Sequence, residues 1–171
     1  MPPAANRIYL AARAILDAVV AGYAAAGVAL PDRQYISHGP PAWDCSLLAV
    51  YQQRGFGHSG NIATETLEPI LPHSSHVLRG ALFAVELVRC YPDVDSSGTE
   101  VVLPSAAAME AGSEELLIDE QLIHNSLLAA EKAGQLGTAC HEVAYGDWQP
   151  LGPMGGLAGG LLVVRVGLTR G

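Results

Sequence analysis

Lysine is almost absent from this chain of 171 residues, in which Lys132 is the only one. The formal net charge is −8. Proteins that grip nucleic-acid phosphates gather lysine and arginine into basic surfaces. The shortage of lysine and the acidic balance therefore argue against a protein that binds nucleic acid tightly.

Long apolar runs and paired cysteines are also lacking. No apolar run approaches the ~20 residues of a membrane-spanning helix, so we expect no membrane contact. The first seven residues lack the charged and then apolar regions of a signal peptide. Three cysteines are an odd number, which argues against the disulfide framework of a secreted domain. We expect a cytoplasmic origin with reduced thiols.

Charged residues are scarce as well. They make up 15% of the chain, whereas half of the residues are apolar. A chain of this length can form one domain with a sizeable core, here expected over residues 1–171. The apolar content exceeds what a lone soluble monomer usually needs, so we expect the protein to assemble with copies of itself.

Two long helices are predicted. Residues 4–26 carry apolar side chains at helical spacing, with Asn6 as the N-cap and Gly27 as the stop. Residues 104–133 are mainly helical, and Gly112 with Ser113 is a point at which this helix could break or begin again. The charged side chains of the second helix are expected to face solvent; they are Asp119, Glu120, Glu131 and Lys132.

Strands are predicted at 34–38, 45–54, 77–91, 138–145 and 161–168. The strand at 45–54 is apolar on both faces, so it is either central or covered on its second side by a partner. Glycine and proline predict long loops at about 55–76 and 146–160. The fold class is α+β: a small antiparallel or mixed sheet of four to five strands, with two main helices packed on one face.

Metal-binding patterns are weak. His73 and His76 have a spacing that binds metals on a helix, but Pro72 disfavours a helix there, and solvated loop histidines are the favoured interpretation. Asp93 and Asp95 resemble a fragment of a calcium loop without its glycine and closing glutamate. The three cysteines could converge on a metal, although separate core cysteines are favoured; they are Cys45, Cys90 and Cys140.

No catalytic constellation emerges. Cys140 and His141 are neighbours on a predicted strand, where successive side chains point to opposite faces and cannot pair. Phosphate-binding, dinucleotide-binding and nucleophile-elbow motifs are missing from the sequence. We therefore expect no enzyme, no cofactor and no metal.

Three motifs carry a resemblance that covers nearly the full length: Trp43-Asp44-Cys45, Glu86-Leu87-Val88-Arg89-Cys90-Tyr91-Pro92, and Trp148-Gln149-Pro150 with Gly152-Pro153-Met154-Gly155-Gly156-Leu157-Ala158-Gly159-Gly160 before a final strand. With them the layout resembles the tail terminator proteins of long-tailed bacteriophages, particularly those infecting actinobacteria. The resemblance implies a non-enzymatic protein, located in the neck of the virion and assembled in the host cytoplasm.

The resemblance also implies partners. Copies of the chain would form a ring, expected to be a hexamer, which caps the tail tube, stops its growth and joins the tail to the head connector or stopper protein. DNA would pass through the lumen without specific binding, which suits the acidic balance.

Interface residues are expected in the two long loops. Trp148, Pro150 and Met154 supply apolar contact area, and Gly155 with Gly156 lets the backbone approach a partner or bend. The loop at 55–76 is expected to contact a neighbour or the tail tube, and it contributes two further candidates, Phe56 and His58. The alternative for Trp148 is packing on its own sheet.

Other functions stay open. A head–tail connector or stopper shares small size and ring assembly with a tail terminator, and the sequence separates the two poorly. A tail tube subunit would be expected to have more strand and less helix. A small cytoplasmic enzyme using Cys140 or a histidine is the alternative of a different class.

Overall fold

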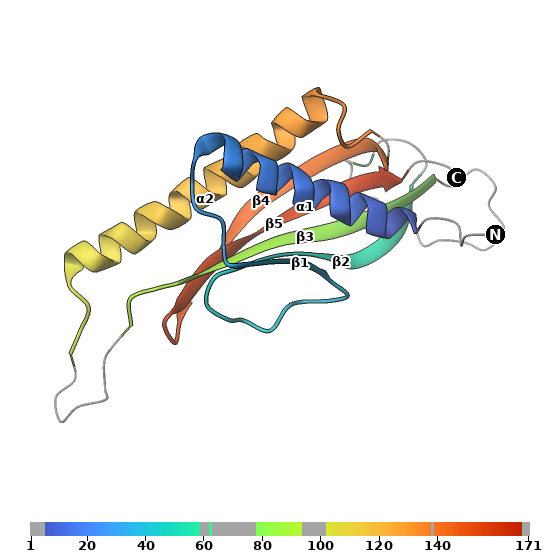
Figure 1. Cartoon of the computed structure of the whole chain (residues 1–171). Helices are drawn as coiled ribbons and strands as arrows, with labels where there is room; N and C mark the ends of the chain where they lie inside the picture. The colour runs from blue at the N-terminus through green and yellow to red at the C-terminus, as the bar shows by residue number, and fades with distance from the viewer. Residues whose placement is uncertain (1–5, 59–61, 63–77, 94–101, 138, 169–171) are drawn as a thin grey trace.

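Two helices pack against one face of a five-stranded sheet (Figure 1). The computed structural model describes residues 6–58, 62, 78–93, 102–137 and 139–168. The α+β expectation is confirmed. The elements, in chain order, are α1 (Arg7–Ala26), β1 (Arg33–Ser37), β2 (Leu47–His58), β3 (Leu78–Cys90), α2 (Ala106–Lys132), β4 (Cys140–Met154) and β5 (Leu157–Leu168).

The sheet is mixed, with the strand order β1-β2-β3-β5-β4. β1 runs parallel to β2, and every other neighbouring pair is antiparallel. β3 is the centre: its Val85 lies opposite Val50 of β2 and opposite Leu162 of β5. The predicted strand at 45–54 is therefore central, between β1 and β3.

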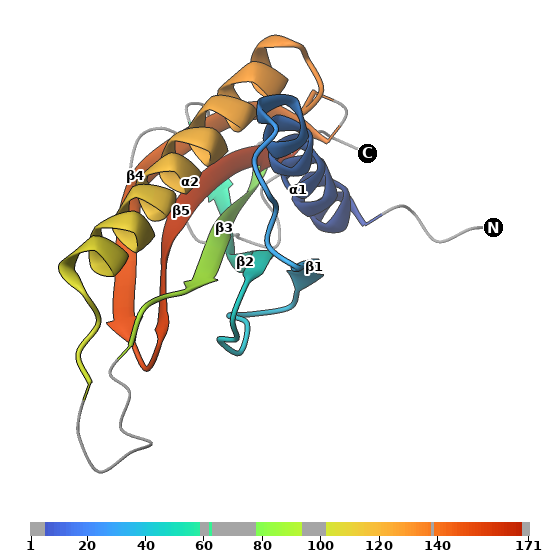
Figure 2. The same ribbon diagram turned by 60° about the vertical axis from the view of Figure 1, so that its left-hand side comes forward.

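The main core lies between the helices and the sheet (Figure 2). Alternation places Phe83, Val85 and Leu87 of β3 on this side, all fully buried, as the sequence predicts. Burying each such side chain contributes roughly 1.5–3 kcal/mol. The helices contribute Ile15, Leu16, Val19, Ile123 and Leu127, and β5 contributes Leu162, Val164, Val166 and Leu168.

Part of the opposite face of the sheet is buried as well. Trp43 packs there on a cluster formed by Leu47, Ala49 and Val88. Glu86 of β3 is buried on this face; its two carboxylate oxygens accept hydrogen bonds from Trp43 Nε1 at 2.6 Å and from the Tyr51 hydroxyl at 2.9 Å. Burial and the adjacent carboxylate raise the pKa of Tyr51. The hydrogen bonds make a buried carboxylate tolerable.

Both helices have the predicted starting caps. Asn6 Oδ1 accepts from the backbone N–H groups of Ile8 and Tyr9, and α1 ends at Gly27, whose φ is 66°. The Ser105 hydroxyl caps α2 by accepting from the backbone N–H of Ala108.

α2 does not break at Gly112, contrary to one sequence expectation. The ring of Tyr91 packs against Gly112, so closely that a Cβ there would crowd it. The Tyr91 hydroxyl also lies 3.2 Å from the Met109 carbonyl and 2.9 Å from Ser113 Oγ. This tertiary contact offsets the roughly 1 kcal/mol that glycine costs within a helix.

α1 confirms the helix predicted at residues 4–26 but is more apolar than expected, since the sequence suggested no run near membrane-spanning length. By length and composition it could cross a membrane. In this fold its apolar stripe packs on the sheet and on α2, with Ile15, Val19 and Tyr23 fully buried. Packing in the core therefore accounts for the apolar composition of α1.

The predicted loop at 146–160 is wrong. These residues form the last part of β4, the first part of β5 and, between them, a tight hairpin turn at Gly155 and Gly156, whose φ values are 54° and 73°. Positive φ at both turn residues suits the twist of a two-residue hairpin and favours glycine.

The predicted loop at 55–76 is wrong at its start, because β2 continues to His58. Apart from Ile62, the rest of that loop lies outside the described residues.

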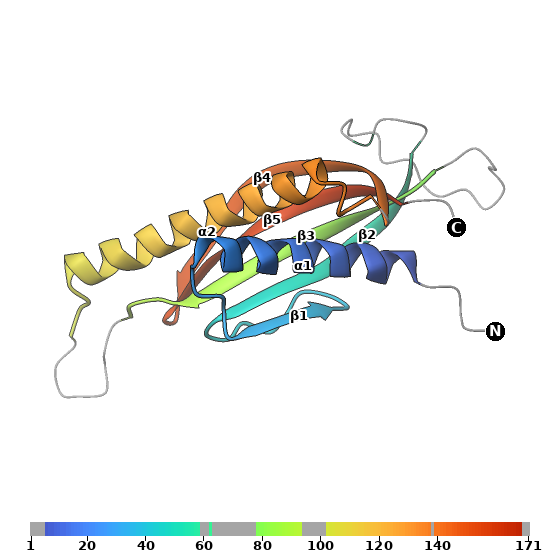
Figure 3. The same cartoon turned by 45° about the horizontal axis from the view of Figure 1, so that its top comes forward.

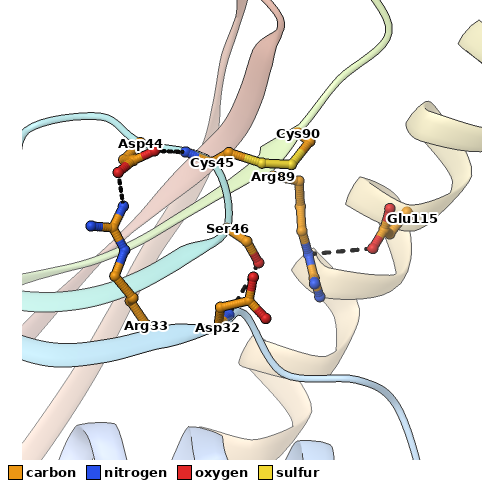
Figure 4. Close-up of a disulfide and its surroundings, with 8 residues drawn as sticks. All are labelled: Asp32, Arg33, Asp44, Cys45, Ser46, Arg89, Cys90 and Glu115. Atoms are coloured by element: carbon orange, nitrogen blue, oxygen red, sulfur yellow. Dashed lines mark hydrogen bonds and ion pairs between the residues drawn. A yellow bond between two sulfur atoms is a disulfide. The ribbon is translucent and has the colours of Figure 1, made fainter.

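A disulfide joins Cys45 to Cys90, so the expectation of reduced thiols is wrong (Figure 4). The register that pairs Leu47 with Val88 brings the two cysteines opposite each other, with their Cα atoms 4.8 Å apart. Sequence spacing alone did not reveal this pairing.

Cys140 is a free, buried cysteine, and burial raises the pKa of its thiol to about 11. Within the described ranges no three potential metal ligands cluster.

The disulfide fixes the segment before β2. Next to it, Asp44 accepts a hydrogen bond from the backbone N–H of Cys45 and pairs with Arg33 of β1. The contact with Arg33, followed by that with the Cys45 N–H, lowers the pKa of Asp44. The Ser46 hydroxyl accepts from the Asp32 backbone N–H at 3.1 Å. These contacts join the edge strand β1 to the end of β3.

Removing this disulfide should lower the free energy of unfolding. The bond closes a loop with a sequence separation of 45, and constraining such a loop in the unfolded chain contributes about 2–4 kcal/mol. We expect the double variant Cys45→Ser with Cys90→Ser to have a free energy of unfolding lower by that amount. Urea unfolding measures the difference. A reductant should destabilise the wild type to the same level and leave the variant unchanged. Equal stability of oxidised and reduced wild type would contradict the prediction.

Candidate interaction surface

An open groove of about 450 Å³ lies between the N-terminal half of α2 and the β4–β5 hairpin. Its size is within the roughly 300–1,000 Å³ typical of ligand pockets. In Figure 3 the N-terminal part of α2 extends past the end of the sheet. The groove is lined by Tyr91, Ser113, Leu116, Leu117, Glu120, Trp148, Pro150, Leu151, Gly152, Pro153, Ala158 and Gly159.

The helix side of the groove is apolar and exposed. Ser113, Leu116, Leu117 and Glu120 follow helical spacing and therefore share one face of α2. Leu117 is 66% exposed, and its neighbour Ile118 is exposed as well. Ile118 points to a neighbouring face of α2 and does not line the groove, whereas Leu117 leaves a large apolar side chain in solvent within it, which is typical of an interaction surface.

The sheet side of the groove contains Trp148. Its ring occupies the space above Gly160 of β5, where a Cβ would overlap it. Trp148 is half-buried and packs against the main core. It therefore packs on its own sheet while part of its surface lines the groove. Its role in assembly stays a prediction.

The remaining hairpin candidates lie at or near the same end. Pro150 lines the groove, and Met154 is 59% exposed where β4 ends. Gly155 and Gly156 form the turn, and the Gly156 carbonyl accepts a hydrogen bond of 2.7 Å from the backbone N–H of Tyr91. This bond ties the tip of the hairpin to the end of β3.

Phe56 is wrongly predicted as an interface residue. It is only 4% exposed, because its ring packs over Gly80 and against Ile62 and Leu82. It also lies at the opposite end of the sheet from the hairpin, near His58 at the end of β2. The side chain of His58 is not among the described parts of the structure. The structure thus brings together Trp148 and Pro150, but not Phe56 or His58.

A buried ion pair sets the position of α2. Asp119 is fully buried, contrary to the expectation that it faces solvent. It accepts two hydrogen bonds from Arg89 of β3, both 2.9 Å, and one of 2.6 Å from the Tyr23 hydroxyl of α1. Arg89 also donates to the Ala29 carbonyl and lies 3.5 Å from Glu115. One carboxylate thus joins both helices to the central strand.

The pKa values around this pair follow from burial and charge. Burial lowers the pKa of Arg89, but the hydrogen bonds and charge of Asp119 raise it by more. Burial and the neighbouring Asp119 carboxylate raise the pKa of Tyr23. Arg89 therefore keeps its charge and Tyr23 its proton at neutral pH, and the network keeps its hydrogen bonds.

The sequence reasoning missed Leu117 and Ile118. A signal was present, because Leu116, Leu117 and Ile118 are consecutive and cannot all face one core. It also missed Tyr91, whose ring lines the groove and packs on Gly112. That contact joins segments distant in the sequence and leaves no local pattern.

Breaking the buried pair should be strongly destabilising. Asp119→Asn leaves Arg89 buried without its counter-charge, which typically costs about 3–5 kcal/mol. Asp17→Asn is the matched control, since Asp17 is a helical aspartate paired with Arg13 at the surface. We expect the control to change the free energy of unfolding by less than ~0.5 kcal/mol. Urea unfolding of both variants measures the difference, and similar small effects would contradict the assignment.

Comparisons with known proteins do not assign the chain to a family. The sequence matches no protein-family model and no curated protein.

Proposed function

We propose that this protein is a structural component of a bacteriophage neck, a tail terminator whose copies form a ring on the tail tube. The ring stops tube growth and presents a surface to the head connector. The observation that carries the proposal is the exposed apolar groove between α2 and the β4–β5 hairpin. Such a surface suits contact with another protein.

The edges of the sheet favour contact through side chains. β4 is an edge strand, and Pro150 and Pro153 remove two backbone donors from it. β1, the other edge, has only five residues. Both features limit the addition of a further strand. Contact between copies through a helix face is therefore favoured over contact through the edges of the sheet.

The enzyme alternative receives no support from Cys140. Its thiol belongs to the helix-side core, and burial raises its pKa to about 11, so it stays protonated at neutral pH. The ring of its neighbour His141 packs against Gly167 of β5. This arrangement is that of a core cysteine.

The test is tube capping. Tail tube protein is polymerised with and without the purified protein, and tube lengths and ends are examined by negative-stain microscopy. We expect shorter tubes with a ring at one end. Binding to the isolated connector or stopper ring, with tube growth unaffected, would replace the terminator assignment by that of a connector protein. No binding to either would contradict a role in the neck.

Trp148→Ala should weaken assembly more than it lowers stability, because the half-buried ring contributes to the groove. Trp43→Ala is the matched control: it removes the other tryptophan, which packs on the opposite face. We expect Trp43→Ala to lower the melting temperature but to leave ring occupancy among folded molecules unchanged. If Trp148→Ala behaves in the same way, Trp148 has only a packing role.

A further inference from the structure

The disulfide is accessible to solvent, unlike the third cysteine. Cys90 is exposed and Cys45 is half-buried, whereas Cys140 is only 3% exposed and belongs to the core on the helix side. A thiol in solution can therefore reach the Cys45–Cys90 bond while Cys140 stays shielded. Exposed disulfides are the ones that reductants open most readily.

The β3 side of this bond is anchored independently of the sulfur atoms (Figure 4). Arg89, which precedes Cys90, makes the buried ion pair with Asp119. Tyr91, which follows Cys90, donates its backbone N–H to the Gly156 carbonyl at 2.7 Å. Both contacts remain when the disulfide opens. The end of β3 therefore keeps its place in either redox state.

The Cys45 side belongs to a connection that is held more weakly. Residues 38–46, which we call the strap, join β1 to β2 and form neither helix nor strand. β1 and β2 are parallel, with Arg33 opposite Leu47, so the strap runs back along β1 before β2 begins (Figure 1). Asp44 of the strap pairs with Arg33, but these two side chains are 59% and 50% exposed. Such an exposed pair holds the strap only weakly.

Trp43 is the part of the strap that covers the sheet. It is half-buried and packs on the cluster of Leu47, Ala49 and Val88, on the face away from the helices. Its indole N–H donates to the buried Glu86 carboxylate at 2.6 Å. The cluster is thus shielded from water by a segment whose covalent link to β3 is the disulfide.

Ser46 lies where the strap meets β2. Its φ is 65°, in the left-handed region that a residue with a Cβ adopts only at an energetic cost. Its hydroxyl and its carbonyl accept hydrogen bonds from the backbone N–H groups of Asp32 and Arg33, at 3.1 Å and 3.3 Å. A strained residue of this kind persists while its surroundings fix it. Ser46 is therefore the hinge at which the strap can turn.

We infer that the Cys45–Cys90 disulfide is a reversible redox switch that controls the strap. With the bond closed, Trp43 covers the apolar cluster. With the bond open, the strap turns away about Ser46 and uncovers that cluster. The rest of the domain stays folded, because the main core lies on the other face of the sheet and contains neither cysteine. The inference does not depend on the proposed function in a phage neck.

A dithiol supplies the electrons for opening. One of its thiolates attacks the exposed Cys90 sulfur, breaks the bond between the cysteines and releases Cys45 as a thiolate, which takes up a proton. The second thiol then loses its proton, attacks the mixed disulfide and releases Cys90, which is protonated in turn. The protein gains two electrons and two protons, and the dithiol becomes a cyclic disulfide. Oxidised glutathione reverses the exchange and becomes two thiols.

Trp43 itself reports the position of the strap. Trp148 is the only other tryptophan, so Trp148→Phe leaves Trp43 as the single emitter. In dithiothreitol we expect its emission to shift to longer wavelength and its quenching by acrylamide to increase, because the indole becomes hydrated. In the wild type, chymotrypsin should cut after Trp43 roughly tenfold faster once the bond is reduced, since cleavage follows the population of the open form.

Cysteine variants provide the controls. Cys45→Ser with Cys90→Ser should give the shifted emission and the fast cleavage with or without dithiothreitol. Cys140→Ser is the matched control and should respond like the wild type, because Cys140 takes no part in the switch. Far-UV circular dichroism should show unchanged helix content after reduction. Oxidised glutathione should restore the original emission and the slow cleavage.

The opposite results overturn the inference. Equal emission and equal cleavage in the two redox states would show that the strap stays closed without the bond. Loss of helix content on reduction would make the disulfide a support of the whole domain. A response that disappears in Cys140→Ser would assign the effect to the wrong cysteine. Emission that does not recover in oxidised glutathione would show that the opening is not reversible.

Discussion

The buried pair of Arg89 and Asp119 is the interaction on which the rest of the structure depends. Arg89 lies near the end of the central strand, Asp119 in the middle of α2, and Tyr23 in the last turns of α1. Charges buried this deeply are stable only while every partner is in place. The pair therefore fixes the position of α2 relative to β3, which apolar packing alone specifies less sharply.

The groove is a consequence of where this anchor lies. Beyond Asp119 toward its C-terminus, α2 buries Ile123, Leu127 and Ala130 against the sheet and α1. Toward its N-terminus the same helix passes the end of the sheet, and Tyr91 and the β4–β5 hairpin provide the nearest contacts. Leu117 remains exposed there because no element among the described residues covers it. Regular elements, α2 and the β4–β5 hairpin, form both sides of the groove, which favours a preformed interface.

The face of the sheet away from the helices depends on different contacts. No described helix lies there, yet Leu47, Ala49 and Val88 are fully buried. Trp43 covers them, and its hydrogen bond to Glu86 and the disulfide at Cys45 hold its segment in place. This cluster is thus covered within one chain, and the exposed apolar groove on the helix side is the surface better suited to a partner.

Local pattern determined the elements, and tertiary contact decided how they meet. Alternation in β2, β3 and β5, the cap at Asn6 and the stop at Gly27 could be predicted, because each depends on neighbours within a few residues. The hairpin at Gly155 and Gly156 was mistaken for a loop. Its strands, β4 and β5, carry glycine and proline there, and these residues take up regular strand structure only because the two strands pair with each other. The burial of Asp119, the Cys45–Cys90 bond and the burial of Phe56 were not predictable, because the partner of each is distant in the sequence. The groove follows from the same cause: Leu117 and Trp148 line one groove only once Arg89 has fixed α2 over the sheet.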